Sequence, residues 1–487
     1  MITQIEIDGF KTFKDFKVEL APFQVIVGPN GSGKSNLFDA LHLLSRLASF
    51  DLEHVIKDMR GDANELFTKL PGGESVDRMK FAVEMLVDRK VQDDFKKSVT
   101  VKYTRLRYEL EIMLGVDIIN LERLYVAHES LRSIQLSEDH WRNKYGLSTS
   151  NDWISNQQDD VVSFISTIGR TTNTAIPIGP EINEPIIYLF SDDESGANNQ
   201  QISGSFQIHA ASRTVLSSIT NLTHFHAFAV RKELLSLNFL HLNPESLRQP
   251  SLTRGPRSLS PDGGNLPTVL ARIQAEDKLA FHIISLDVAN LVPGVLRIKV
   301  EQDKPSDKYV IYAETLDQRD FSAMVLSDGT LRLLALATLR NDPQFHGVLC
   351  LEEPENGVDP LHLKIMARLL RGMVTDFNDL EQTDEPLRQV LVTTHSPSFV
   401  SLPDVIDSLL VAFTPTHIEG KSATALRVTR MMPVATPTTL SRIKADINGD
   451  NAVAFYSIDQ VRKYLDSETL EEAREQLEEA RENLSQR

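Results

Sequence analysis

A glycine-rich loop at residues 28–35 contains the first cluster of residues whose types and spacing suit a chemical task. The octapeptide fits the pattern Gly-x-x-x-x-Gly-Lys-Ser/Thr in full. Glycines let the backbone curl so that successive N–H groups point inward at phosphate oxygens. A lysine at the seventh position reaches the β- and γ-phosphates, and the hydroxyl that follows it binds Mg²⁺. The residues expected to contact phosphate are Gly28, Asn30, Gly31, Ser32, Gly33, Lys34 and Ser35.

Two carboxylates far along the chain form a second candidate site. Residues 347–351 are an apolar run that predicts a buried strand, and Glu352 and Glu353 follow it directly. Open α/β sheets bind ligands at the carboxyl ends of their strands. We therefore expect Glu352 in the metal shell, and Glu353 as the group that orients the attacking water or accepts its proton. The alternative is that two acidic residues simply end a strand.

His395 follows another predicted buried strand, at residues 391–394. A neutral imidazole at the same sheet edge could donate a hydrogen bond to a γ-phosphate and so respond to its presence. A lone histidine is more often structural. Its place at the end of a strand of this kind favours the functional interpretation.

A serine and a glycine precede the predicted helix that contains residues 333–339. Ser327 and Gly329 place a hydroxyl and an unobstructed backbone at the start of this helix, which makes a second site suited to an anion. One phosphate loop does not need two such sites for one nucleotide. Two copies arranged head to tail do, because each could offer this turn to the γ-phosphate held by the other. The alternative is an ordinary helix cap.

The elements that must position these residues follow from periodicity. Residues 2–7 alternate apolar and polar, residues 25–27 are apolar, and residues 35–48 repeat apolar residues at helical spacing. A strand, a phosphate loop and a helix in this order start an α/β unit. A β-like pattern runs from 80 to 114, and a strong α/β pattern returns from 326 to 413. We predict an α/β fold with a mixed or parallel sheet and flanking helices.

Taken in order, these motifs resemble those of the ABC-type AAA ATPases, and within them the RecF/SMC-like and OLD-like group. The likeness rests on Ile-Asp-Gly-Phe-Lys-Thr-Phe-Lys-Asp-Phe, the phosphate loop, Leu-Ser-Asp-Gly-Thr, Leu-Glu-Glu-Pro-Glu-Asn-Gly and Thr-Thr-His-Ser-Pro. It covers residues 1–70 and 320–415 and is greatest to a bacterial branch without a recognisable TOPRIM nuclease domain. The resemblance implies a P-loop ATPase head that binds and hydrolyses ATP with Mg²⁺.

The resemblance also implies roles for single residues. Ser327 and Gly329 would act in trans, on the nucleotide of the other copy, and Asp359 would lie between the two nucleotides. Glu353 would be the general base and His395 the γ-phosphate switch. Two features depart from the family pattern. Glu352 stands where many members have aspartate, and no glutamine could be matched to the one that completes the metal site.

The resemblance also suggests how the chain is divided. Residues 1–114 would form the N-terminal part of the head, and 115–320 an inserted lid or dimerisation domain. Residues 321–420 would supply the signature turn, the carboxylates and His395. Residues 421–487 would form an extension, with a charged amphipathic helix at 467–487 that suits either a short coiled coil or packing on its own domain. No internal repeat is apparent.

Composition restricts the function classes. Lysine and arginine number 51 against 68 aspartates and glutamates, a net charge of −17, which argues against a histone-like coat on nucleic acid. The single cysteine, Cys350, cannot form an intrachain disulfide, and no apolar run is long enough to cross a bilayer. We predict a cytoplasmic protein that does not enter the membrane.

The leading hypothesis is a homodimer, or a multiple of dimers, that hydrolyses ATP and couples closure to DNA or a partner effector. DNA maintenance or anti-phage defence would be its setting. A second hypothesis is a slow ATP-binding scaffold that recruits a separate nuclease or toxin. The ATPase subunit of a transporter is a third, and the long separation of the motifs speaks against it. Residues 418–422 faintly suggest a nuclease domain, but a β-hairpin is favoured. Arginines in the predicted surface loop 244–264 could touch DNA, although solvation is the simpler interpretation.

Overall fold

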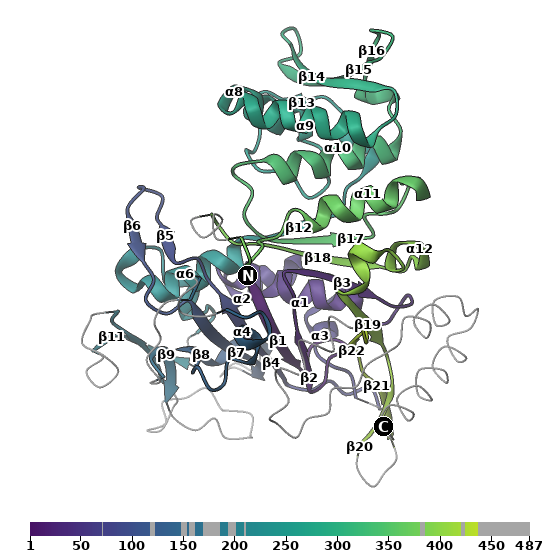
Figure 1. The fold of residues 1–487 in the computed structure, drawn as a ribbon. Coiled ribbons are helices and arrows are strands. Elements are labelled where there is room, and N and C mark those ends of the chain that lie inside the picture. Colours follow the sequence, from purple (N-terminus) through teal and green to yellow (C-terminus); the bar gives the residue numbers. More distant parts are fainter. Residues whose placement is uncertain are drawn as a thin grey trace.

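The computed structural model describes residues 1–70, 72–116, 122–147, 153–154, 161–168, 186–192, 201–208, 211–379, 385–419 and 424–436. A six-stranded sheet lies at the centre of the fold (Figure 1). Five of its strands are parallel, and the last, at one edge, is antiparallel. The strand order is β12 (Leu237–Leu240), β17 (Gly347–Glu352), β18 (Arg388–Thr394), β3 (Phe23–Val27), β19 (Leu409–Phe413) and β22 (Arg430–Pro433).

Alternate residues of the central strands enter different cores. On β17, Val348 and Cys350 face one core, and Leu349 and Leu351 face the other. A strand buried on both faces needs a continuous apolar run, which is what the sequence shows. Helices cover both faces of the sheet: Figure 1 shows α10 and α11 on one side and α1 and α2 on the other. The predicted α/β class with a mixed sheet is confirmed.

Thirteen α-helices and two 3₁₀ turns occur among the described residues. The helices are α1 (Lys34–Leu47), α2 (Leu52–Asp58), α3 (Ala63–Leu66), α4 (His140–Lys144), α5 (Val215–Ser218), α6 (Phe225–Leu235), α7 (Pro244–Leu247), α8 (Leu266–Glu276), α9 (Lys278–Leu291), α10 (Asp328–Asn341), α11 (Pro360–Arg371), α12 (Pro397–Val400) and α13 (Pro403–Ile406). The 3₁₀ turns are η2 (Leu222–His224) and η3 (Ala323–Val325).

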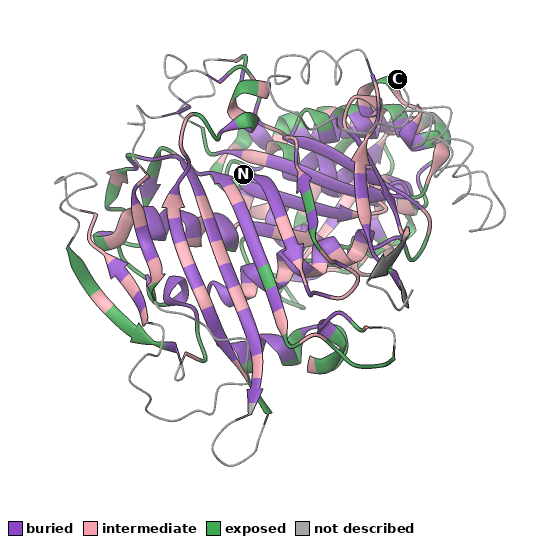
Figure 2. Ribbon diagram, turned by 90° about the horizontal axis from the view of Figure 1, so that it is seen from below, coloured by how far each residue is buried: buried purple, intermediate pink, exposed green. Residues whose placement is uncertain are grey.

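An antiparallel sheet of eight strands shares a hydrophobic core with α1, α6 and one face of the central sheet. Buried residues alternate with partly exposed ones along several of its strands (Figure 2), because one face packs inward and the other meets solvent. Its strands are β11 (Ile202–Gln207), β10 (Ile186–Phe190), β9 (Ser163–Ile168), β8 (Glu122–Ser133), β7 (Arg105–Val116), β4 (Arg78–Leu86), β1 (Ile2–Asp8) and β2 (Phe16–Glu19).

The second core joins the other face of the central sheet to α8, α9, α10 and α11. A small sheet packs on α8 and α9 (Figure 1), and two separate hairpins complete the described strands. The small sheet contains β13 (Ser251–Leu252), β14 (Val295–Asp303), β15 (Lys308–Thr315) and β16 (Asp320–Ser322). The hairpins are β5 (Lys90–Gln92) with β6 (Ser98–Thr100), and β20 (Thr416–Glu419) with β21 (Thr424–Arg427).

Several smaller expectations can be compared with these elements. The hairpin favoured near residue 418 is present as β20 and β21. The prediction of a surface loop at 244–264 was wrong in part, because α7 lies there and Leu247 is fully buried. The predicted helix at 467–487 falls outside the described residues. Elements between 115 and 320 contribute to three sheets, and the division at residues 114, 320 and 420 stays a prediction. Among the described residues, no helix is long and apolar enough to cross a membrane.

Candidate functional site

The phosphate loop links β3 to α1 at the carboxyl edge of the central sheet. Gly33 caps α1 with a φ of 92°, a left-handed conformation that suits glycine. A Cβ on Gly28 would lie 2.3 Å from the carbonyl oxygen of Ala412, so this position also requires glycine. Lys34 is buried, and its Nζ donates to the carbonyl oxygens of Gly28 at 2.6 Å and Pro29 at 2.9 Å. The ammonium group therefore lies inside the curl of the loop.

The hydroxyl of Ser32 shows that the loop fits an anion. Its Oγ is buried and has no hydrogen-bond partner among the described residues. A Cβ on Gly31 would meet no atom within 4 Å, so the loop is open on that side. A buried hydroxyl without a partner costs about 1–3 kcal/mol, which a phosphate oxygen would relieve.

Two threonines that sequence analysis did not identify, Thr12 and Thr429, form hydrogen bonds with the phosphate loop or the helix after it. Thr429, between β21 and β22, is fully buried and donates from Oγ1 to the carbonyl oxygen of Ser32 at 3.3 Å. Its hydroxyl also lies 2.7 Å from Thr12 Oγ1, which accepts from Asn36 Nδ2 at 2.8 Å. A Cβ on Gly33 would lie 2.1 Å from Thr429 Oγ1. No local motif marks these threonines, because they reach the loop only through the fold.

The two predicted catalytic side chains meet directly. His395 Nδ1 lies 2.8 Å from Glu353 Oε1, and Asn356 Nδ2 donates to Glu353 Oε2 at 2.7 Å. Parallel pairing of β17 with β18 aligns Glu352 with Thr393, so the residues after both strands reach one edge. Burial alone would raise the pKa of Glu353. The hydrogen bonds from Asn356 and His395 outweigh burial and hold this pKa below the usual glutamate value.

The negative charges of carboxylates from β17 and from the turn after it act on the ammonium group of Lys34. Burial lowers the pKa of Lys34, and three carboxylates act in the opposite direction, in the order Glu353, Glu355 and Glu352. Glu355 was given no role from sequence. It is buried, accepts a hydrogen bond from Thr394 Oγ1, and has its pKa raised mainly by burial.

The residues present suit Mg²⁺ held together with a nucleotide. Within the described part of the chain, no three His, Cys, Asp or Glu side chains cluster closely enough to hold a metal by themselves. Mg²⁺ is usually bound through one or two carboxylates and phosphate oxygens, with waters in the other positions. Ser35 and Glu352 match that sparse ligand set. Their roles stay predictions.

A cavity of about 580 Å³ opens beside Glu352. It lies between α1 and β12, and His241 and Asn238 are among its lining residues. Leu240 pairs with Leu351 across β12 and β17, so His241 follows in register beside Glu352.

The serine-glycine turn lies at the start of α10 and packs beside the turn after β17. Ser327 is exposed and caps α10, since its Oγ accepts from the N–H of Thr330 at 3.2 Å. No hydrogen bond links it to the phosphate loop among the residues described. Gly329 is buried against the turn after β17, where a Cβ would lie 2.9 Å from the carbonyl oxygen of Gly357. Asp359 is exposed just before α11.

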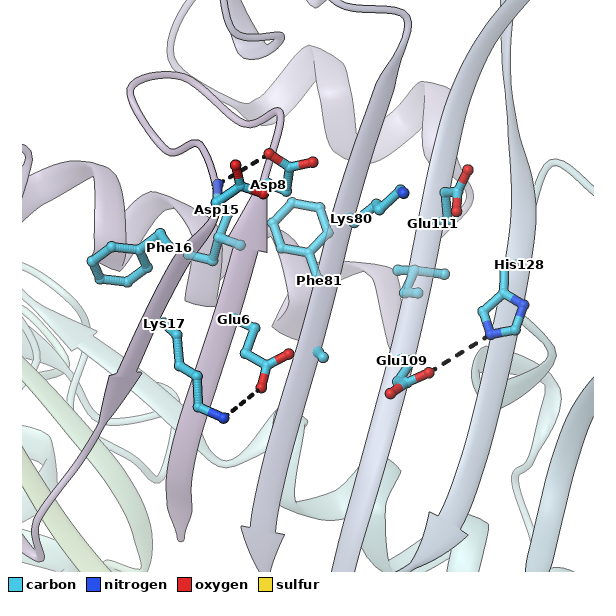
Figure 3. Close-up of a pocket in the computed structure, with 13 residues that line it drawn as sticks. Glu6, Asp8, Asp15, Phe16, Lys17, Lys80, Phe81, Glu109, Glu111 and His128 are labelled. Carbon is cyan, nitrogen blue, oxygen red and sulfur yellow. Dashed lines mark hydrogen bonds and ion pairs between the residues drawn. The ribbon is translucent and has the colours of Figure 1, made fainter. Parts of the chain in front are cut away.

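A groove on the outer face of the antiparallel sheet is a separate cavity, of about 560 Å³ (Figure 3). Its charges largely satisfy one another. Lys17 pairs with Glu6 at 3.1 Å, and His128 lies 3.9 Å from Glu109. His226 is buried, and its Nδ1 lies 2.9 Å from Asp192 Oδ1. Neither the groove nor the His226–Asp192 pair contributes a residue to the phosphate site.

Comparisons with known proteins match this chain to AAA ATPase domains. The family model described as "AAA ATPase domain" matches residues 1–218. The model described as "AAA domain, putative AbiEii toxin, Type IV TA system" matches residues 165–401. The DNA replication and repair protein RecF of Aliivibrio fischeri (strain MJ11) is 33% identical over 67 residues. The two family models and this RecF stretch support the predicted RecF/SMC-like, ABC-type AAA ATPase. The matched stretch covers 14% of this chain and 19% of that RecF, about a fifth of the relative's length.

Solved structures similar to this chain include SMC head domains. A Smc head bound to the C-winged helix domain of ScpA is 12% identical, with 88% of this chain and 97% of that chain covered and a TM-score of 0.44. The SMC head domain from Thermotoga maritima is also 12% identical, with 89% and 99% covered and a TM-score of 0.37. A Smc head with an extended coiled coil, bound to the C-terminal domain of ScpA derived from Pyrococcus furiosus, is 13% identical, with 92% and 99% covered and a TM-score of 0.40.

Proposed function

We propose that two copies of this chain close on two ATP molecules, hydrolyse them, and use the closure to control DNA or a partner effector. One observation carries the proposal. The phosphate loop, Glu353 and His395 share one sheet edge, whereas Ser327 is exposed and, within the described part of the chain, makes no hydrogen bond to that edge. A second copy would supply the missing turn, because closed two-fold assemblies bring the same surface of each subunit to the other.

Each residue has a defined task in this proposal. Lys34 and the backbone of the phosphate loop bind the phosphates, and Ser35 and Glu352 hold Mg²⁺. Mg²⁺, when bound, would neutralise charge on the β- and γ-phosphates. Glu353 accepts the proton of the attacking water, for which its lowered pKa keeps it ionised. His395 donates a hydrogen bond to the γ-phosphate, and Ser327 and Gly329 contact the γ-phosphate of the other copy, with Asp359 nearby.

Turnover of Glu353→Gln against wild type tests this function. We expect ATP binding to persist and kcat to fall by about 10²–10⁴-fold, the usual cost of losing a general base. Lys34→Ala should lose ATP binding as well. Glu109→Gln, in the groove of Figure 3, is a matched control that should leave kcat unchanged. Equal, near-background rates for wild type and Glu353→Gln would contradict hydrolysis.

That contradictory result would favour a second candidate, a slow ATP-binding scaffold that recruits a separate nuclease or toxin. The toxin system named in one matching family description supports considering it. The RecF relative, named for DNA replication and repair, supports a DNA-related setting instead. A salt titration of DNA binding with and without ATP separates these settings, because phosphate contacts weaken as salt rises. Absence of binding at low salt in both states would exclude direct DNA contact.

A further inference from the structure

The short segment from residue 241 to Arg248 runs from the carboxyl edge of the central sheet, where Glu352 lies, to the serine-glycine turn. It starts where β12 ends beside Glu352 and includes α7, for which Arg248 is the C-cap residue. The side chain of Asn243 caps α7 by accepting from the N–H of Glu245 at 2.8 Å. Leu247 is fully buried in the core beneath α10. The backbone that carries Arg248 is therefore held at both ends of the helix.

The side chain of Arg248 binds both neighbours of Ser327. Its Nη2 donates to the carbonyl oxygen of Leu326 at 3.0 Å and forms an ion pair with the carboxylate of Asp328. Guanidinium suits this task, because its planar donors can hold a carbonyl and a carboxylate at once. Sequence analysis considered this arginine for DNA contact. In the structure its guanidinium group instead contacts the serine-glycine turn.

The turn is held on its other side by backbone packing. Gly329 is buried against the turn after β17, where an added Cβ would lie 2.9 Å from the carbonyl oxygen of Gly357. Arg248 restrains the residues before and after Ser327. Ser327 itself is exposed, as contact with the ATP of a second copy requires.

We propose that Arg248 is a positioning residue for the ATP bound by the other subunit, because it aims Ser327 across the dimer. The inference rests on the proposed function, since it requires a turn that acts in trans. The ion pair of Arg248 with Asp328 is partly exposed, so it contributes little to stability. We therefore expect loss of Arg248 to impair hydrolysis more than folding.

Steady-state kinetics give the first test. Arg248→Ala should lower kcat at least about tenfold with the affinity for ATP unchanged, because catalysis tolerates little misplacement. Asp328→Asn removes the same ion pair from the other side and should act alike, so one poorly folded variant does not end the test. Arg248→Lys should recover part of the rate. Arg257→Ala, whose guanidinium pairs with exposed Glu276, is the matched control. An unchanged kcat in both Arg248→Ala and Asp328→Asn overturns the proposal.

Mixed dimers give the decisive test. When Arg248→Ala is mixed with Glu353→Gln, one site of each mixed dimer combines an intact base with an intact turn. We expect activity well above the sum of the two parent variants. Ser327→Ala mixed with Glu353→Gln serves as the control for trans action. If the Ser327 mixture recovers activity and the Arg248 mixture does not, Arg248 acts within its own subunit and the proposal is overturned. If neither recovers, the shared-site dimer itself fails, and this inference fails with it.

Discussion

The carboxylate of Glu353 is restrained at both oxygens, by Asn356 and by His395. Its backbone has a φ of 46°, a left-handed conformation that costs a residue with a side chain about 1–3 kcal/mol. Its N–H donates to the carbonyl oxygen of Thr393 at 2.9 Å, which holds the residue in that conformation. Such cost is usually tolerated where a side chain must be aimed.

Asn356→Ala should therefore lower kcat about tenfold and leave the KM for ATP unchanged, since only the base loses its orientation. Steady-state ATPase assays measure both constants. Asn378→Ala, an exposed asparagine bonded to Asp376, is the control. A kcat equal to wild type would show that His395 alone suffices to hold the base.

Glu129, on β8, is a buried carboxyl group far from the phosphate loop in the sequence. It accepts hydrogen bonds from the N–H groups of Val215 and Leu216 and from the hydroxyl of Tyr108. Burial raises its pKa to about 7 in spite of these donors. The folded protein therefore binds this proton more tightly than the unfolded chain does.

The free energy of unfolding should fall as pH rises from the ordinary glutamate value through 7, because ionising buried Glu129 disfavours the folded state. At about 1.4 kcal/mol per tenfold change in proton affinity, the full effect is on the order of 3 kcal/mol. Urea unfolding at pH 5 and pH 8 measures it. Glu129→Gln should reduce this pH dependence, whereas exposed Glu138→Gln should keep it. Equal slopes in all three proteins would refute the assignment.

At the scale of elements, one buried ion pair joins the antiparallel sheet to α4. Arg105 on β7 is fully buried and binds Asp139, the N-cap of α4, at 2.8 Å and 2.9 Å. The same guanidinium donates to Thr3 on β1 and lies 5.2 Å from the ring of Trp141. Three elements that are distant in the sequence therefore depend on one side chain.

Arg105→Met should lower the free energy of unfolding by about 3–5 kcal/mol, because it leaves Asp139 charged and buried without its partner. Denaturant unfolding followed by circular dichroism measures the loss. Arg319→Met, which removes an exposed pair with Asp317, should leave the free energy of unfolding nearly unchanged. A loss for Arg105→Met as small as that of this control would mean that the pair contributes nothing.

On the scale of the whole molecule, apolar residues are exposed beside the serine-glycine turn. Met324 and Val325, in η3, directly precede Leu326 and Ser327 and are 54% and 68% exposed. Exposed apolar surface often marks an interface. Its position fits the proposed dimer, in which this turn faces a second copy.

Val325→Asp should prevent dimer formation with a non-hydrolysable ATP analogue and preserve nucleotide binding, because a charge would be buried at the interface. Light scattering of the purified protein measures the assembly. Leu279→Asp on α9 is a matched control, since Leu279 is also 68% exposed and apolar. A dimer that forms equally well with Val325→Asp would place the interface elsewhere.

Local patterns were enough to predict much of the site. The phosphate loop, the strand that ends at Glu352 and the helix after Ser327 depend on neighbouring residues, and the structure contains each element. Thr429 and Glu355 were given no role, because each contacts residues from another strand or loop. Asn356 was also given no role, although it contacts Glu353 only three residues earlier. The segment 244–264 was misjudged, because its proline and glycine content hid the buried anchor Leu247.

The sequence by itself determined the elements and the order of the motifs, because hydrogen bonding and periodicity act over a few residues. Tertiary structure decided which of them meet. Parallel pairing of β17, β18 and β3 brings Glu353, His395 and Lys34 to one edge, although long stretches of chain separate them. The tertiary structure also places the guanidinium group of Arg248 against Asp328 rather than in solvent. Such long-range contacts arise from packing two cores on one sheet, and no short-range pattern encodes them.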